Sequence, residues 1–188
     1  MPELKLQQPV GQLDCTPLLQ LFDRCFVESF NTCLLKGEDE PVYLPADENN
    51  SLHRVIFAHG FFSSALHEIA HWCLAGDNRR QQVDYGYWYA ADGRSRDQQK
   101  AFESVEVKPQ AVEWILSKTC YHRFKISVDN LNGEATDPKP FKRAVYQQVQ
   151  AYCRHGLPQR AEIFRQVLSA HYGCPDSLAA ERYQLQHL

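Results

Sequence analysis

A His-Glu-x-x-His motif lies within residues 61–76, where His67 and His71 are four residues apart and Glu68 follows the first histidine. On a helix this spacing puts both imidazoles on one face, where they can bind one metal ion. Glu68 projects about 100° away around the helix axis, so it is better placed to bind a metal-bound water than to complete the ligand set. A third protein ligand must therefore come from another part of the chain.

The context of the motif favours a metal site. About 0.02 matches are expected by chance in a chain of this composition. The alternative interpretation is a helix with two core or surface histidines and a solvated glutamate. Against it, apolar residues recur at helical spacing and Gly76 follows where helices commonly end. These apolar residues are Leu66, Ile69, Ala70, Cys73 and Leu74.

Residues 97–118 supply the candidates for the third ligand. Their apolar pattern predicts helix, in which Pro109 either opens a second helix or introduces a kink. Glu103, Glu106 and Glu113 are three and seven residues apart and share a helix face. We expect Glu106, the central one, to be the ligand, with Glu103 as the alternative. If neither binds metal, the row is a solvated helix face.

The remaining elements must position these two helices. Periodicity predicts further helices over residues 14–31, 138–155 and 158–172, and short strands over 33–35, 42–44, 54–58 and 120–128. An aromatic extended run at 83–89 would border the site, and the polar last dozen residues are expected to be loosely held. We therefore predict an α+β fold with a small mixed sheet and several helices around the metal helix, in a zincin-like arrangement.

Length and composition indicate an ordinary globular protein. The 188 residues fit a single domain over 1–188, and 44% are hydrophobic. The net charge of −3 gives no overall field that would recruit nucleic acid or an anionic membrane. The sequence has no apolar run of about 20 residues and no signal-peptide layout, so we expect a cytoplasmic protein. The seven scattered cysteines form no C-x-x-C pair and are expected to be reduced and structural.

The residues alone allow more than one chemistry. Zinc with Glu68 as general base would give a peptidase-like hydrolase, whereas iron(II) held by two histidines and one carboxylate would give an oxygenase. The motif is foremost a zinc-peptidase signature, but the chain lacks the longer His-x-x-Gly-x-x-His extension and a secretion signal. A noncatalytic binding protein that is stabilised by its metal is a third possibility.

Six stretches carry a resemblance to a known family. They are HEIAHWC at 67–73, RR at 79–80, DYGYWY at 84–89, DGR at 92–94, FESVEVKPQA at 102–111 and DNL at 129–131. With them the chain resembles the bacterial elongation factor P hydroxylase family over most of its length. The resemblance implies an enzyme that hydroxylates the lysine of elongation factor P already extended by a β-lysyl group, the last step of a modification that supports translation of proline-rich sequences.

The resemblance also implies a metal centre of two histidines and one carboxylate. The ligands would be His67, His71 and a glutamate of residues 102–113, for which Glu106 is the first choice. Hydroxylation of an unactivated C–H bond needs a metal that binds and reduces O₂, which redox-inert zinc cannot do, so iron(II) is the implied metal and O₂ the cosubstrate. The sequence identifies neither a 2-oxoglutarate clamp nor a reductant. Glu68 would orient a ligand or assist proton transfer.

The implied substrate side chain is doubly cationic. Acidic and aromatic residues near the metal are therefore expected to bind it through charge pairing and cation–π contact. The candidates are Asp84, Tyr85, Tyr87 and Trp88. Elongation factor P is the expected protein partner, and no membrane or direct nucleic-acid partner is expected.

Overall fold

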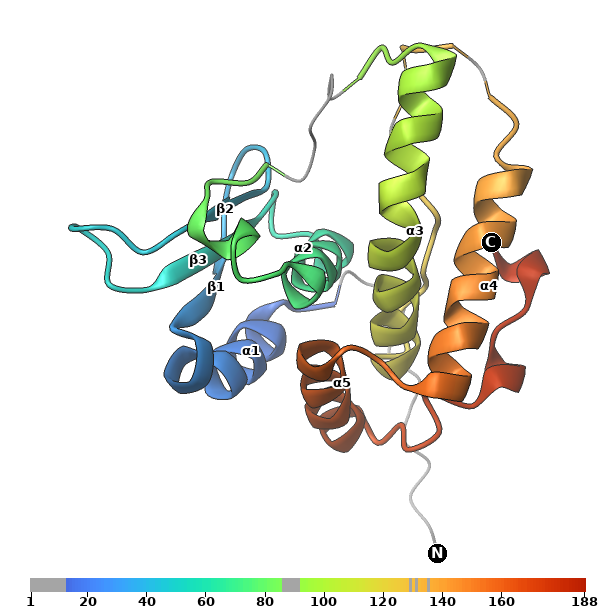
Figure 1. Cartoon of the computed structure of the whole chain (residues 1–188). Coiled ribbons are helices and arrows are strands. Elements are labelled where there is room, and N and C mark those ends of the chain that lie inside the picture. Colours follow the sequence, from blue (N-terminus) through green and yellow to red (C-terminus); the bar gives the residue numbers. More distant parts are fainter. Residues whose placement is uncertain (1–12, 86–91, 129, 131, 135) are drawn as a thin grey trace, which may run out of the picture.

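Five α-helices stand beside a three-stranded sheet in the computed structural model, which describes residues 13–85, 92–128, 130, 132–134 and 136–188 (Figure 1). The α-helices are α1 Thr16–Phe30, α2 Phe62–Leu74, α3 Arg96–Thr119, α4 Lys139–His155 and α5 Gln159–Tyr172. The strands are β1 Thr32–Lys36, β2 Val42–Leu44 and β3 His53–Phe57, and short 3₁₀ helices span Arg79–Gln81, Ala180–Arg182 and Leu185–His187. The predicted α+β class is confirmed.

The sheet is small and mixed. Its order is β1-β3-β2, with β1 parallel and β2 antiparallel to the central β3. The strands predicted at 33–35, 42–44 and 54–58 are therefore confirmed. After β3 the chain turns through His59 and Gly60, both with positive φ, and enters α2. The sheet thus determines where the helix with both histidines begins.

One side of α2 is buried in an aromatic cluster. Trp72 lies 4.7 Å from Phe26 and 5.1 Å from Phe22 between ring centroids, and Phe22 lies 5.7 Å from Phe164 of α5. Burial of each such side chain contributes about 1.5–3 kcal/mol. The cluster fixes α2 against α1 and α5, so the opposite side of α2 is directed toward α3.

Arg160 of α5 caps the end of α2. Its Nη2 donates to the carbonyl oxygens of Trp72 (3.0 Å), Cys73 (3.2 Å) and Ala75, and its guanidinium lies 4.8 Å from the Trp72 ring centroid. Carbonyls at the C-terminal end of a helix carry partial negative charge. The Trp72 carbonyl also accepts a weaker backbone hydrogen bond from the Ala75 N–H at 3.3 Å. Ala75 has extended backbone angles, so α2 ends without a left-handed glycine at Gly76.

The predicted helix at 97–118 is the single helix α3. It begins at a capping box between Ser95 and Gln98 and continues through Pro109, so this proline does not open a second helix. The helix packs against α2, α4 and α5. Because α2 crosses and contacts it, its inward face can supply a ligand to the histidines (Figure 1).

The prediction of a strand over residues 120–128 is wrong. Residues 122–128 are extended, but they join no sheet in the described part of the chain. Buried Phe124 stacks on Trp114 of α3 at 5.6 Å between ring centroids. The alternating pattern reflects packing of one side of the segment onto helices.

Two further expectations concern the aromatic run and the C-terminus. In the run at 83–89, Asp84 pairs with Tyr43 in an isolated antiparallel bridge, and residues 86–91 lie outside the described residues.

The expectation of a loosely held C-terminus is wrong. Tyr183 is 2% exposed, meets Trp114 edge-on at 5.3 Å and donates its hydroxyl hydrogen to the Ser177 carbonyl. Its burial explains why this polar segment is held.

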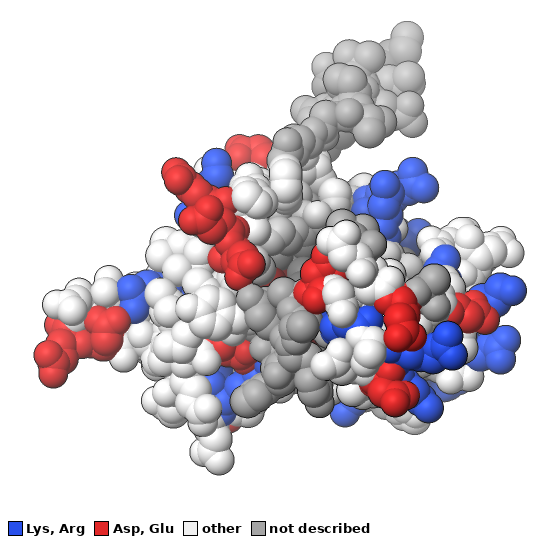
Figure 2. Space-filling model, turned by 90° about the horizontal axis from the view of Figure 1, so that it is seen from above, with Lys and Arg blue, Asp and Glu red and all other residues white. Residues whose placement is uncertain are grey.

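Three further observations concern the surface charge, the length of the helices and the cysteines. From above, basic and acidic side chains are interspersed on the side of α3 and α4, in keeping with the net charge of −3 (Figure 2). Within the residues that the structure describes, no helix combines the length and the apolar character needed to cross a membrane. All seven cysteines are free, as predicted.

Candidate metal centre

His67 and His71 face each other on α2. Their Nε2 atoms are 2.9 Å apart, and the ring centroids are separated by 4.6 Å. This follows from the four-residue spacing, which stacks the two side chains on the helix face that the aromatic cluster leaves free. One cation between the two Nε2 atoms could bind both rings.

Glu106 of α3 approaches the same point. The side chain is 2% exposed, with Oε1 3.2 Å from His71 Nε2 and Oε2 3.6 Å from His67 Nε2. Ligand atoms of His67, His71 and Glu106 all lie within 4.8 Å of one another. Two imidazole nitrogens and one carboxylate oxygen suit a first-row divalent metal, including iron(II) and zinc. The residues therefore fit a metal ion that leaves further coordination positions open.

The charges of the group favour binding of a cation. Burial alone would raise the pKa of Glu106, but the charge and hydrogen bond of His71, with the charge of His67, lower it to about 2. Burial would likewise lower the pKa of His67, but hydrogen bonding and charge from Glu113, with the charges of Glu106 and Glu68, raise it to about 10. Without a metal, positive charge on the His67 ring is thus held near an ionised Glu106.

Glu113 holds the other nitrogen of the His67 ring. Its Oε2 is 2.8 Å from Nδ1, and its residue is 7% exposed. Metal-binding histidines commonly donate their second N–H to a carboxylate, which fixes the tautomer and the ring orientation. Glu113 is therefore suited to direct the lone pair of His67 Nε2 toward Glu106 and His71.

An open cavity of about 710 Å³ reaches this group. Its volume is in the range of ligand-binding sites. Carboxylates of Glu68, Glu106 and Glu113 line it together with apolar Phe61 and Phe102, and the exposed Arg123 and Lys125 line it as well. Such a lining suits a long cationic side chain, because the methylene groups can contact the rings while the charge meets the carboxylates.

Comparisons with known proteins identify the family of this chain. The chain matches the family model described as Elongation factor P hydroxylase over residues 21–183. The chain belongs to the elongation factor P hydroxylase family. One relative, named Elongation factor P lysine hydroxylase, comes from Haemophilus influenzae and is 51% identical over 168 residues, which cover 89% of this chain and 94% of the relative.

In this member of the elongation factor P hydroxylase family, the two candidate carboxylate ligands have different surroundings. Glu106 lies with the histidines, whereas Glu103 accepts a hydrogen bond of 3.1 Å from Gln99 and is not part of the metal-binding group. Glu113 is on the same face, as predicted, but its contact with His67 Nδ1 was not foreseen. The sequence signal for this contact was the spacing of seven residues between Glu106 and Glu113, which puts both side chains on one face of α3.

Glu68 lies between two cavities of this family member. It lines the large cavity and also a small pocket of about 30 Å³. Burial raises the pKa of Glu68, while the charges of His67 and His71 oppose that rise. A carboxyl group with a raised pKa beside candidate metal ligands is suited to accept or donate a proton.

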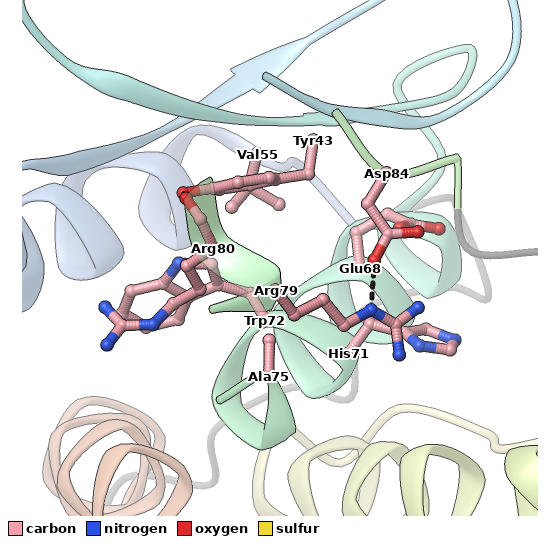
Figure 3. Close-up of a pocket in the computed structure, with 9 residues that line it drawn as sticks. All are labelled: Tyr43, Val55, Glu68, His71, Trp72, Ala75, Arg79, Arg80 and Asp84. Atoms are coloured by element: carbon pink, nitrogen blue, oxygen red, sulfur yellow. Dashed lines mark hydrogen bonds and ion pairs between the residues drawn. The ribbon is translucent and has the colours of Figure 1, made fainter. Parts of the chain in front are cut away.

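The predicted substrate-binding residues divide into three groups. Asp84 lies in the small pocket with Glu68 and His71, where Arg79 Nε donates to its carboxylate (Figure 3). A pocket of about 30 Å³ holds about two water molecules, not a lysyl side chain. Tyr85 is 51% exposed. Tyr87 and Trp88 lie outside the described residues.

Proposed function

We propose that this chain hydroxylates a lysine side chain of elongation factor P at an iron(II) centre held by His67, His71 and Glu106, with O₂ as cosubstrate. Membership of the elongation factor P hydroxylase family over residues 21–183 supports the reaction. The observation that carries the site is the convergence of two imidazole nitrogens and a buried carboxylate beside an open cavity. Iron(II), when bound, supplies the O₂ chemistry that zinc lacks.

The residues around the centre have separate tasks in this proposal. Glu113 holds His67 in the tautomer that leaves Nε2 free for the metal. Phe61 and Phe102 contact the aliphatic part of the substrate side chain and exclude water, while cavity carboxylates attract its ammonium groups. Glu68 orients a ligand or carries a proton.

The substrate in this proposal is the lysine that already bears a β-lysyl group. The extended side chain is long and doubly cationic, which suits an open cavity whose lining includes three carboxylates. Substrate binding by Asp84, Tyr85, Tyr87 and Trp88 stays a prediction. We further propose a cytoplasmic enzyme, because translation takes place there, and a zincin-like arrangement, supported by the position of the His-Glu-x-x-His helix directly after β3.

Mass spectrometry of elongation factor P tests the function. We expect factor from cells with this gene to be heavier by one oxygen atom than factor from cells without it. His67→Ala should abolish the gain, whereas the exposed His155→Ala should keep it. β-Lysylated factor without any gain, in cells that contain the intact enzyme, would contradict the proposal.

Peptide cleavage and metal replacement distinguish the proposed hydroxylase from a zinc hydrolase. A peptidase would cleave a protein or peptide, and Glu68→Gln would abolish cleavage while metal content stayed unchanged. We expect no cleavage of elongation factor P, and activity that returns with iron(II) but not with zinc after metal removal.

A further inference from the structure

Residues 122–128 form an extended segment along the metal cavity. The side chains of Arg123, Lys125 and Ser127 line the cavity, while Phe124 between them is buried against the core. This alternation is that of a β-strand with one side packed and one side open.

The backbone in the middle of this segment is available for hydrogen bonding. In the described part of the chain, no N–H or C=O group from residue 123 to 126 has a hydrogen-bond partner. The two ends are fixed. His122 N–H donates to the Ser117 carbonyl at 2.8 Å, and both backbone groups of Ser127 bond to the Gln110 side chain at 3.1 and 2.8 Å. A held strand with free donors and acceptors is a template for another strand.

The segment is coupled directly to the metal-binding group. Gln110, which fixes Ser127, also donates to Glu106 Oε2 at 3.3 Å. A chain that lies along residues 123–126 would therefore run beside the ligands, within reach of the cavity.

The charges around the cavity point to the kind of occupant. Exposed Arg123 and Lys125 give the segment's side of the cavity a positive charge, whereas Glu68 and the buried Glu106 and Glu113 line the cavity elsewhere. A partner that matches both would direct a cationic side chain inward and present acidic groups to Arg123 and Lys125.

We infer that residues 123–126 are the docking edge for the protein substrate, which adds an extended segment of its own backbone as a strand. The cationic side chain of that segment enters the cavity, and acidic groups of the same protein meet Arg123 and Lys125. Main-chain hydrogen bonds hold the segment and the cavity selects its side chain. The identity of the partner as elongation factor P rests on the proposed function.

Hydrogen exchange tests the docking edge. The full iron(II)-loaded chain is compared alone and with β-lysylated elongation factor P, and exchange is followed at each amide from 123 to 126. We expect amides on the paired edge to exchange at least about tenfold more slowly with the substrate protein. Unchanged exchange at all four amides, in a sample that hydroxylates its substrate, would overturn the inference while the function stands. Absence of hydroxylation would instead overturn the function.

Charge reversal tests the basic side of the segment. The double variant Arg123→Glu, Lys125→Glu should raise KM about tenfold at low salt with little change in kcat, and the effect should shrink as salt is added. Arg143→Glu is the matched control, since Arg143 is exposed on α4 and does not line the cavity. A KM for the double variant within about twofold of that of the control would contradict the docking edge.

Discussion

The His67 ring is held from both sides. Its Nδ1 meets Glu113 and its Nε2 faces His71 and Glu106, so the ring has one orientation in which both nitrogens have partners. The sequence predicted the stacking of the two histidines but not this second carboxylate.

Substitution of Glu106, the proposed carboxylate ligand, should weaken metal binding, whereas substitution of Glu103 should not. Glu106→Gln should lower metal affinity by at least about 100-fold, because a buried neutral amide is a poor replacement for the charged ligand. Metal content measured by inductively coupled plasma mass spectrometry checks this. Glu103→Gln is the control, because Glu103 bonds to Gln99 instead and should keep its metal. Equal loss in both variants would refute the assignment.

Metal binding should release a proton from His67. With its pKa raised to about 10, the ring of the metal-free chain carries a proton at pH 8 that a metal must displace from Nε2. Below pH 10, affinity should therefore fall as pH falls, by about tenfold per unit for this one group. Calorimetry in buffers of different ionisation enthalpy measures the release.

Glu113→Gln provides the comparison for this pH effect. It removes the charge that keeps His67 protonated, so fewer protons should be released at pH 8, and loss of ring orientation should weaken metal binding about 10- to 100-fold. Unchanged proton release in this variant would assign the proton to another group.

Helix periodicity could not by itself choose among the three glutamates. Glu103, Glu106 and Glu113 share one face of α3 because they are spaced by three and seven residues. The choice depends on where α2 crosses α3 along its length, which is a property of tertiary packing. The sequence therefore narrows the candidate ligand to this row, and the packing places Glu106 beside His67 and His71, which supports it as the proposed ligand.

At the scale of elements, helices were more predictable than strands. Each helix carries its own 3.6-residue pattern, and α1, α4 and α5 lie within a residue or two of their predicted ranges. A strand also needs a partner elsewhere in the chain, which a local pattern cannot supply. Residues 122–128 have the alternation of a strand but no partner strand among the described residues.

The cap on α2 can be tested through Arg160. Arg160→Ala removes hydrogen bonds to the carbonyls of Trp72, Cys73 and Ala75, and should lower the free energy of unfolding by about 2 kcal/mol. For a chain of this length the melting temperature should fall by about 4–8 °C. Arg154→Ala, at an exposed position of α4, is the control and should change stability by less than about 0.5 kcal/mol. Similar melting temperatures for the two variants would exclude a stabilising cap.

At the scale of the whole molecule, the C-terminal segment supports the site from behind α3. Tyr183 packs edge-on against Trp114, which is next to Glu113 in the sequence. The segment was expected to be loose because it is polar, and a single aromatic residue reverses that expectation.

Tyr183 substitutions separate packing from hydrogen bonding. Tyr183→Ala should lower the free energy of unfolding by about 3–5 kcal/mol, because it leaves a cavity against Trp114. Tyr183→Phe removes only the hydroxyl group that donates to Ser177 and should cost about 1 kcal/mol. Chemical denaturation measures both. Equal losses would mean that the hydrogen bond, not the ring, holds the segment.

Arg160 also has a consequence for the order of events during synthesis. The helix with both histidines is complete once residue 74 has been translated, but its guanidinium cap is encoded 86 positions later. A nascent chain that has left the ribosome only as far as α3 would expose both histidines and Glu106 on helices that α5 does not yet hold. We therefore expect firm loading of a metal ion only in the nearly finished polypeptide, so that fragments from interrupted synthesis would compete poorly for that ion.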